Sequence, residues 1–228
     1  MTRLLVLLLL AVAAPAWAID YKIELIVFAN TEPQAFHSEQ WAMEVEPPEM
    51  DTAVDLFGGS RPSGFVPLAA EDLAEARQLL ASSDRYEVLK HVVWQQPGLA
   101  AADAVPVRIH GGQDYGAQYP ERMQPRLEVG EDGNIVEIPG PERLEQLDGT
   151  VRVELGRFLH VYTDLLLRKP VVLEQVDPET QQAVQTPALL DIPMREHRRM
   201  RSRELHYIDH PLLGVLVQIT PVEEAGSQ

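Results

Sequence analysis

The sequence of 228 residues contains no cysteine. This absence excludes disulfide bonds, thiolate zinc sites and cysteine nucleophiles. It also excludes a lipoprotein anchored through an acylated cysteine after the N-terminal apolar run. The fold must therefore be stabilised by a hydrophobic core, for which 45% apolar residues are sufficient.

Basic residues are also scarce. The chain has 19 Lys and Arg against 35 Asp and Glu, which gives a formal net charge of −16. General nucleic-acid binding depends on neutralising phosphates with basic side chains, so this balance predicts no nucleic-acid partner. The same acidic charge opposes adhesion to anionic lipid and favours solubility.

Long apolar runs are confined to the N-terminus. Arg3 precedes an apolar run over residues 4–14, and Ala16-Trp17-Ala18 then supplies small residues at the −3 and −1 positions. The run is shorter than the ~20 residues of a spanning helix, so we interpret residues 1–18 as a signal peptide cleaved after Ala18. The alternative is an uncleaved membrane anchor. Because export without disulfides fits a bacterial periplasm, we expect a soluble periplasmic protein with no stable membrane insertion.

Hydrophobic patterning predicts an α+β fold. Period-two alternation indicates strands, and apolar residues at helical spacing indicate one packed helix over about 68–82. The predicted strands cover residues 21–28, 86–95, 105–110, 126–129, 135–138, 150–167, 194–207 and 212–220. We therefore expect a mainly antiparallel sheet with long C-terminal strands and long irregular connections. We expect a single domain over 19–228, with an irregular connection at 30–66 and a frayed tail at 221–228.

The predicted strand over 150–167 has one apolar face and one face with polar and aromatic side chains, which we call the decorated face. Gly156 is expected to form a bulge or bend in it. The decorated face carries Arg152, Glu154, Phe158, His160, Tyr162 and Asp164. Trp94 lies in an apolar strand and is expected in the core. Trp41 lies in the irregular connection and is expected to attach it to the domain.

Arginine is concentrated in one segment, MREHRRMRSRELHYIDHP at 194–211. Five arginines fall within nine residues: Arg195, Arg198, Arg199, Arg201 and Arg203. If the segment is one strand, four of them share a face with His197, and a row of guanidinium groups suits bidentate capture of carboxylates or phosphates. Alternatively, they pair across strands with acids of the chain, such as Glu154 and Asp164.

Catalytic and metal sites are weakly indicated. His206, Asp209 and His210 could begin a metal site, but on a strand Asp209 points away from the two histidines. There is no Gly-x-Ser-x-Gly or Ser-x-x-Lys motif to support a serine nucleophile. We therefore predict no cofactor and no metal, and interpret these residues as hydrogen-bonded turn residues before Pro211.

Four stretches together resemble the CsiV family of periplasmic peptidoglycan-binding proteins. They are YKIELIVFAN followed by HSEQW, LLASSDRYEVLKHVVWQQPG, GRFLHVYTDLLLR and RRMRSRELHYIDHPLLGVLVQI. The resemblance implies a non-enzymatic protein of Gram-negative bacteria that binds the murein sacculus. It further implies support of wall assembly through the machinery that activates bifunctional penicillin-binding synthases, with a lipoprotein activator as partner. It supplies no binding residues.

The residues themselves suggest a site. Stem peptides of peptidoglycan carry the carboxylates of D-Glu and of diaminopimelate or D-Ala, which guanidinium groups can bind. We therefore expect a ligand site formed by Arg199, Arg201, Arg203, Tyr207 and His160, which would hold those carboxylates and a sugar face. Two alternatives remain open: a periplasmic metal-dependent hydrolase or amidase, and a protein–protein scaffold whose partner docks on residues 30–66.

Overall fold

A computed structural model describes residues 19–43, 45–59, 61–69, 71–130, 132–176 and 181–223. The expected signal peptide, and residues 224–228 of the expected frayed tail, lie outside these residues. Within the described chain the longest helix has eight residues, and none reaches the length and hydropathy of a membrane span.

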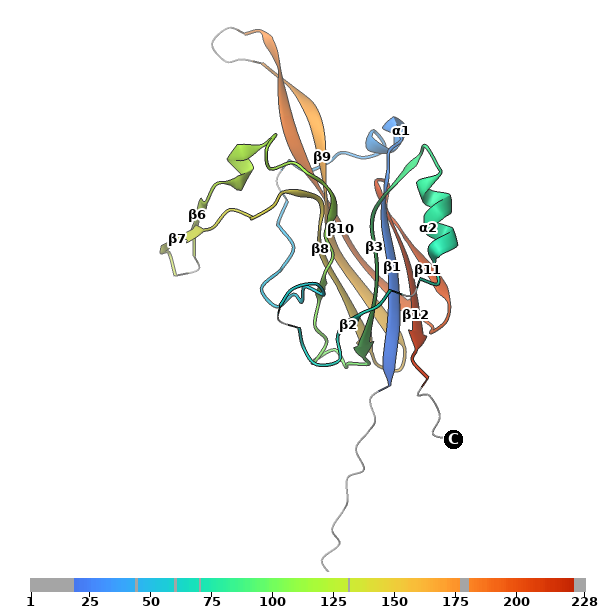
Figure 1. Cartoon of the computed structure of the whole chain (residues 1–228). Helices are drawn as coiled ribbons and strands as arrows, with labels where there is room; N and C mark the ends of the chain where they lie inside the picture. The colour runs from blue at the N-terminus through green and yellow to red at the C-terminus, as the bar shows by residue number, and fades with distance from the viewer. Residues whose placement is uncertain are drawn as a thin grey trace, which may run out of the picture.

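Antiparallel strands form two large sheets and one small one (Figure 1). The first sheet has the order β11-β12-β1-β3-β2, the second β10-β9-β8-β4 with β5 also paired to β8, and β6 and β7 form a two-stranded sheet. In chain order the elements are β1 (Asp20–Asn30), α1 (Pro33–Phe36), β2 (Val66–Pro67), α2 (Ala74–Ala81), β3 (Tyr86–Pro97), β4 (Val107–Arg108), β5 (Gly111–Asp114), η1 (Pro120–Met123), β6 (Arg126–Val129), β7 (Ile135–Ile138), β8 (Glu145–Leu155), β9 (Leu159–Val176), β10 (Ala183–Met200), β11 (Leu205–Asp209) and β12 (Leu213–Pro221). The α+β, mainly antiparallel fold class is confirmed.

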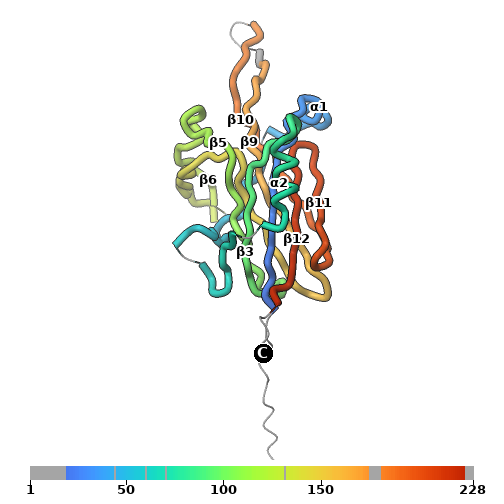
Figure 2. Tube along the Cα trace, turned by 45° about the vertical axis from the view of Figure 1, so that its right-hand side comes forward, coloured from blue at the N-terminus to red at the C-terminus, as the bar shows by residue number. Residues whose placement is uncertain are grey.

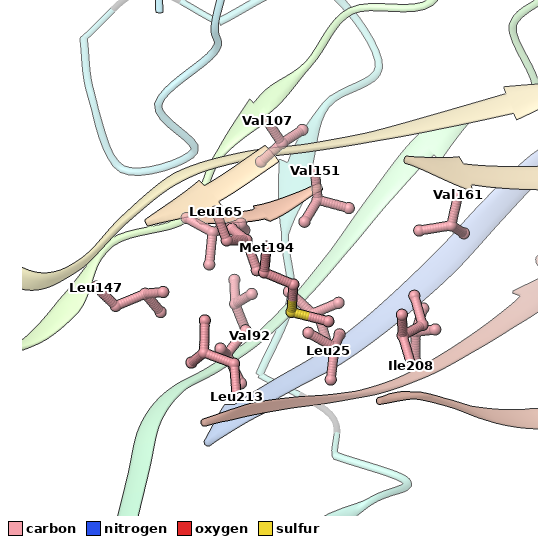
Figure 3. Packing of buried hydrophobic residues seen from close by; sticks show 14 of the residues in the cluster. Leu25, Val92, Val107, Leu147, Val151, Val161, Leu165, Met194, Ile208 and Leu213 are labelled. Atoms are coloured by element: carbon pink, nitrogen blue, oxygen red, sulfur yellow. The ribbon is translucent and has the colours of Figure 1, made fainter. Parts of the chain in front are cut away.

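The hydrophobic core lies between the two large sheets. Alternate residues of their strands point into it, including Leu25 and Val92 from one sheet and Val151, Val161 and Met194 from the other (Figure 3). The indole of Trp94 is fully buried there, and its Nε1 donates to Gln96 Oε1 at 2.8 Å, so its assignment to the core is confirmed. Trp41 packs against the edge of the same core, as expected.

The outer face of the first sheet is covered by α2 (Figure 2). Ile26 and Phe28 on β1 pack there against Leu73, just before the helix, and against Ala76 and Leu80 on it. Both faces of β1 are covered. Consecutive residues toward its end are therefore apolar, whichever face they point to. The helix is shorter than the predicted 68–82, since Val66–Pro67 pairs with β3 and the Leu68 N–H donates to the Val93 carbonyl.

Two long strands predicted from alternation are each two strands. The stretch 150–167 turns back at residues 156–158, where Leu155 pairs with Leu159. Because the turn has three residues, inward-facing residues fall at every second position on both sides of it. The sequence pattern therefore does not reveal the turn. The stretch 194–207 ends one strand at Met200 and begins another at Leu205, with Arg203 at a φ of +66° between them. That turn carries the chain from one large sheet to the other.

One end of the second sheet projects beyond the body. β9 and β10 pair continuously from Leu159↔Met200 to Val176↔Ala183, and their far portion forms a two-stranded ribbon that stands clear of the other strands (Figures 1 and 2). The opposite end holds both ends of the described chain, where the Val222 N–H donates to the Asp20 carbonyl at 2.8 Å.

The stability of this fold should carry a pH dependence from His210. Burial lowers the pKa of its imidazole, against the raising influence of Glu39, Glu196 and Asp209, and its Nδ1 accepts the Leu212 N–H at 3.2 Å. A histidine with a lowered pKa binds fewer protons folded than unfolded, so its contribution to stability is present above about pH 6.5 and is lost as the pH falls. We expect the melting temperature to drop more between pH 7.5 and 5 in the wild type than in His210→Asn, which keeps an acceptor that does not titrate. Parallel pH profiles would contradict this.

Candidate functional site

The exposed, outward face of β8, β9 and β10 brings polar side chains together. Register pairs Arg199 with His160, His197 with Tyr162, and Arg195 with Asp164. The intervening residues of β9, Val161 and Thr163, are buried, so the paired side chains point to the opposite, outward face. This face is the decorated face that the alternation of 150–167 predicted.

Four side chains form a row of stacked rings and guanidinium on this face. The guanidinium carbon of Arg152 lies 4.7 Å from the ring centre of Tyr162, which stacks on His197 at 4.4 Å and 12°. His197 in turn stacks on His160 at 5.1 Å, and the Nδ1 of His160 lies 2.8 Å from the Nε2 of His197. We call these four residues the stacked row. Stacking within the row occupies the faces of Tyr162 and His197, so a ligand would meet the edges and hydrogen-bonding atoms of these rings.

Arginines gather at the end of the stacked row, at the β8–β9 turn. The guanidinium carbons of Arg199 and Arg157 lie 4.6 and 5.7 Å from the ring centre of Phe158. Neither guanidinium group forms an ion pair or a hydrogen bond within the part of the chain that the structure describes. Beside them a hollow of about 410 Å³ is lined by Tyr21, Leu155, Arg157, Phe158, Leu159, Met200, Arg201, Ser202 and Glu204. We call Arg157, Arg199 and Arg201 the arginine cluster.

The three arginines of 194–203 that lie outside the arginine cluster are held by the protein itself. Arg195 donates to Asp164 at 2.9 Å and to the Glu46 carbonyl at 2.6 Å, so cross-strand pairing with Asp164 is confirmed. Arg198 donates to the Tyr207 carbonyl, and Arg203 to Glu223 at 2.9 Å. Arg201 has a long contact of 3.8 Å with Glu204. The other expected acid, Glu154, pairs with Arg152 instead.

Of the five residues expected to form the site, the structure brings three together. Arg199 and His160 are neighbours, and Arg201 lies in the turn just beyond. Arg203 also lies in that turn, because the strand ends at Met200, so the four arginines and His197 do not form one continuous row.

Tyr207 belongs to the other sheet. Its ring stacks on Phe28 at 6.2 Å, and its hydroxyl donates to Asp209 at 2.5 Å. Burial, followed by that hydrogen bond and the charge of Asp209, raises the pKa of Tyr207. Its ring therefore lies on the α2 side of the molecule and not in the stacked row, although its carbonyl accepts from Arg198.

The residues of the hydrolase alternative do not converge. His206 lies 3.6 Å from Glu204, Asp209 accepts from Tyr207, and His210 accepts from Leu212. Across the described ranges, no group of three or more His, Asp or Glu is arranged to hold a metal ion.

Several residues of this face were not named as candidates from sequence. Arg152 and Phe158 share the decorated face of 150–167, and that pattern was the signal that could have found them. Arg157 lies in the hidden turn, so no alternation pointed to it.

A β-sandwich that carries stacked rings on one exposed sheet face, with guanidinium groups that no described residue pairs, has the features of a binding protein. The chain belongs to the CsiV family of peptidoglycan-binding proteins, whose family model matches residues 1–222, essentially the whole chain. Searches of curated proteins and of solved structures found no match.

Proposed function

We propose that this protein binds peptidoglycan through the arginine cluster and the stacked row. The observation that supports this most is that two guanidinium groups, those of Arg157 and Arg199, have no ion pair or hydrogen bond among the described residues of a chain of net charge −16. Most other arginines of the described residues are neutralised by neighbouring acids or hold backbone carbonyls. Two guanidinium groups left without an acidic partner beside the same ring are available to an anionic ligand.

The two parts of the site suit different parts of the ligand. Guanidinium groups of the arginine cluster would bind the stem-peptide carboxylates by charge-assisted hydrogen bonds. The edges and hydrogen-bonding atoms of Tyr162, His197 and His160 would contact the sugar hydroxyl groups. Because the remaining surface is acidic, it would discourage indiscriminate adhesion to the polyanionic wall and leave binding to this face.

The wider role follows from the family. We infer that residues 1–18 direct export, that the protein works in the periplasm without catalysing a reaction, and that it supports wall assembly. There it would assist activation of bifunctional penicillin-binding synthases, with a lipoprotein activator as its partner. Membership of a peptidoglycan-binding family supports the periplasmic location, and the resemblance of the sequence supports the remainder.

Sedimentation with purified sacculi tests the site. We expect the chain from Ile19 onward to pellet with sacculi and to be released as salt increases, because screening weakens exposed ionic contacts. Arg199→Ala/Arg201→Ala should weaken binding about tenfold or more, since each lost charge-assisted hydrogen bond is worth about 1.5 kcal/mol or more. Bound fractions across a sacculus titration measure the effect.

The matched control is Arg77→Ala/Arg85→Ala, which removes the same charge on the α2 side of the molecule. Arg77 and Arg85 are partly exposed and pair with Glu71 and Glu32. Equal losses in both variants would indicate that only net charge matters, and unchanged binding of a folded Arg199→Ala/Arg201→Ala protein would place the site elsewhere.

A further inference from the structure

The β6–β7 sheet is an incomplete structure. Its two four-residue strands pair only with each other, and it lies beside the sandwich rather than within either large sheet (Figure 1). An isolated two-stranded hairpin is marginally stable in water and gains stability from a further strand. In the described residues each strand keeps one edge of backbone N–H and C=O groups without a strand partner.

One face of this hairpin carries three exposed apolar residues. Register places Leu127, Val129 and Ile135 on it, 71, 75 and 72% exposed, together with Glu137 opposite Leu127. Exposed apolar residues scattered singly are normal, whereas a contiguous group such as this one marks an interaction surface.

The other face looks onto acidic residues. Arg126 and Glu128 pair with each other there at 2.7 Å and line a hollow of about 630 Å³ between β6 and residues 46–52. Glu46, Glu49 and Asp51 complete the acidic lining. The two faces of this short ribbon therefore differ. One carries three exposed apolar residues and Glu137, and the other, through Arg126 and Glu128, borders a hollow whose lining has an excess of negative charge.

We propose that β6–β7 is completed by an extended segment of a protein partner that alternates apolar and basic side chains. A third strand would take up the free backbone groups of one edge. Because successive side chains of a strand point to opposite faces, its apolar residues would cover Leu127, Val129 or Ile135 while its basic residues reach the acidic hollow. Charge complementarity selects this occupant over a second copy, whose own acids would face the same hollow.

Two model peptides provide the test. The first peptide is short, has capped termini and alternates valine and lysine. The second has the same composition, with all valines before all lysines. We expect the alternating peptide to bind the chain from Ile19 onward at least about tenfold more tightly than the second peptide. Fluorescence anisotropy of the labelled peptides measures both affinities. Amide hydrogen exchange of β6 and β7 should slow when the alternating peptide is present, because its strand protects them.

Leu127→Asp/Ile135→Asp should reduce the affinity for the alternating peptide at least about tenfold. Leu79→Asp, which changes an equally exposed leucine on α2, should leave it unchanged. Both variants replace exposed side chains and should fold, and both should still pellet with sacculi, which separates this surface from the proposed peptidoglycan site.

Three results would overturn the proposal. If the alternating peptide and the peptide with all valines first bound equally well, charge attraction alone would explain the binding. Undiminished binding by a folded Leu127→Asp/Ile135→Asp protein would place the peptide elsewhere. A wild-type dimer in sedimentation equilibrium that is lost in this variant would identify a second copy as the occupant.

Discussion

Replacing Gly149 with alanine is expected to lower the free energy of unfolding by about 3 kcal/mol or more. Gly149 lies in β8 opposite Leu165 of β9, with a φ of +151°. A Cβ built on it would lie 2.3 Å from the Asp164 carbonyl oxygen and 2.7 Å from the Leu165 Cα. These neighbours are backbone atoms, so alanine fits only if the two central strands of the sheet separate. Urea unfolding followed by far-UV circular dichroism measures the loss.

Gly156→Ala is the matched control, because Gly156 follows the same strand. Only the Phe158 carbonyl oxygen, at 4.0 Å, would be near its Cβ, so we expect little change. If Gly149→Ala unfolded at the same urea concentration as the wild type, the close approach of β8 and β9 would be wrong.

Replacing Glu24 with alanine is expected to cost about 3 kcal/mol, because a buried charged acceptor with several donors is removed. Glu24 lies on β1 and is 1% exposed. Its carboxylate accepts the backbone N–H groups of Asp72 and Leu73, at 2.7 and 2.8 Å, and its Oε1 lies 2.8 Å from His91 Nε2. Without it, two backbone donors just before α2 and one imidazole lose their buried partner.

The loss should be local as well as global. Amide exchange in α2 should accelerate in Glu24→Ala, because the carboxylate attaches the start of the helix to the sheet. Glu24→Gln keeps an acceptor oxygen and should recover part of the lost stability, as urea unfolding would report. An alanine variant as stable as the glutamine variant would show that the carboxylate is not what attaches the helix.

Local patterns predicted the strands better than their ends. The inward positions Val151, Val153, Val161 and Leu165 follow from alternation alone, because one face of a strand is buried. The β8–β9 and β10–β11 turns did not follow from it. The β8–β9 turn preserves the alternation. The main feature of the β10–β11 turn is the positive φ of Arg203, and an arginine in the sequence does not indicate a positive φ.

Long-range contacts explain what was missed in the site. Sequence proximity grouped Tyr207 with the arginines, but a turn of four residues moves it to the other sheet. Conversely, Arg157 and Arg199 are 42 positions apart in the printed sequence and meet over one ring, Phe158. The helix start was mislocated for a related reason, because the acceptor near its N-terminus, Glu24, comes from a strand about 50 residues earlier.

The uninterrupted pairing of β9 has a mechanical consequence. A strand rises about 3.3 Å per residue, so Leu159 and Val176 stand roughly 55 Å apart along a single hydrogen-bonded element. The arginine cluster lies at the first end, and the projecting ribbon forms the second. If the proposed peptidoglycan site is right, a wall strand bound at one end of β9 would be held at a set distance from whatever contacts the ribbon, without an intervening linker.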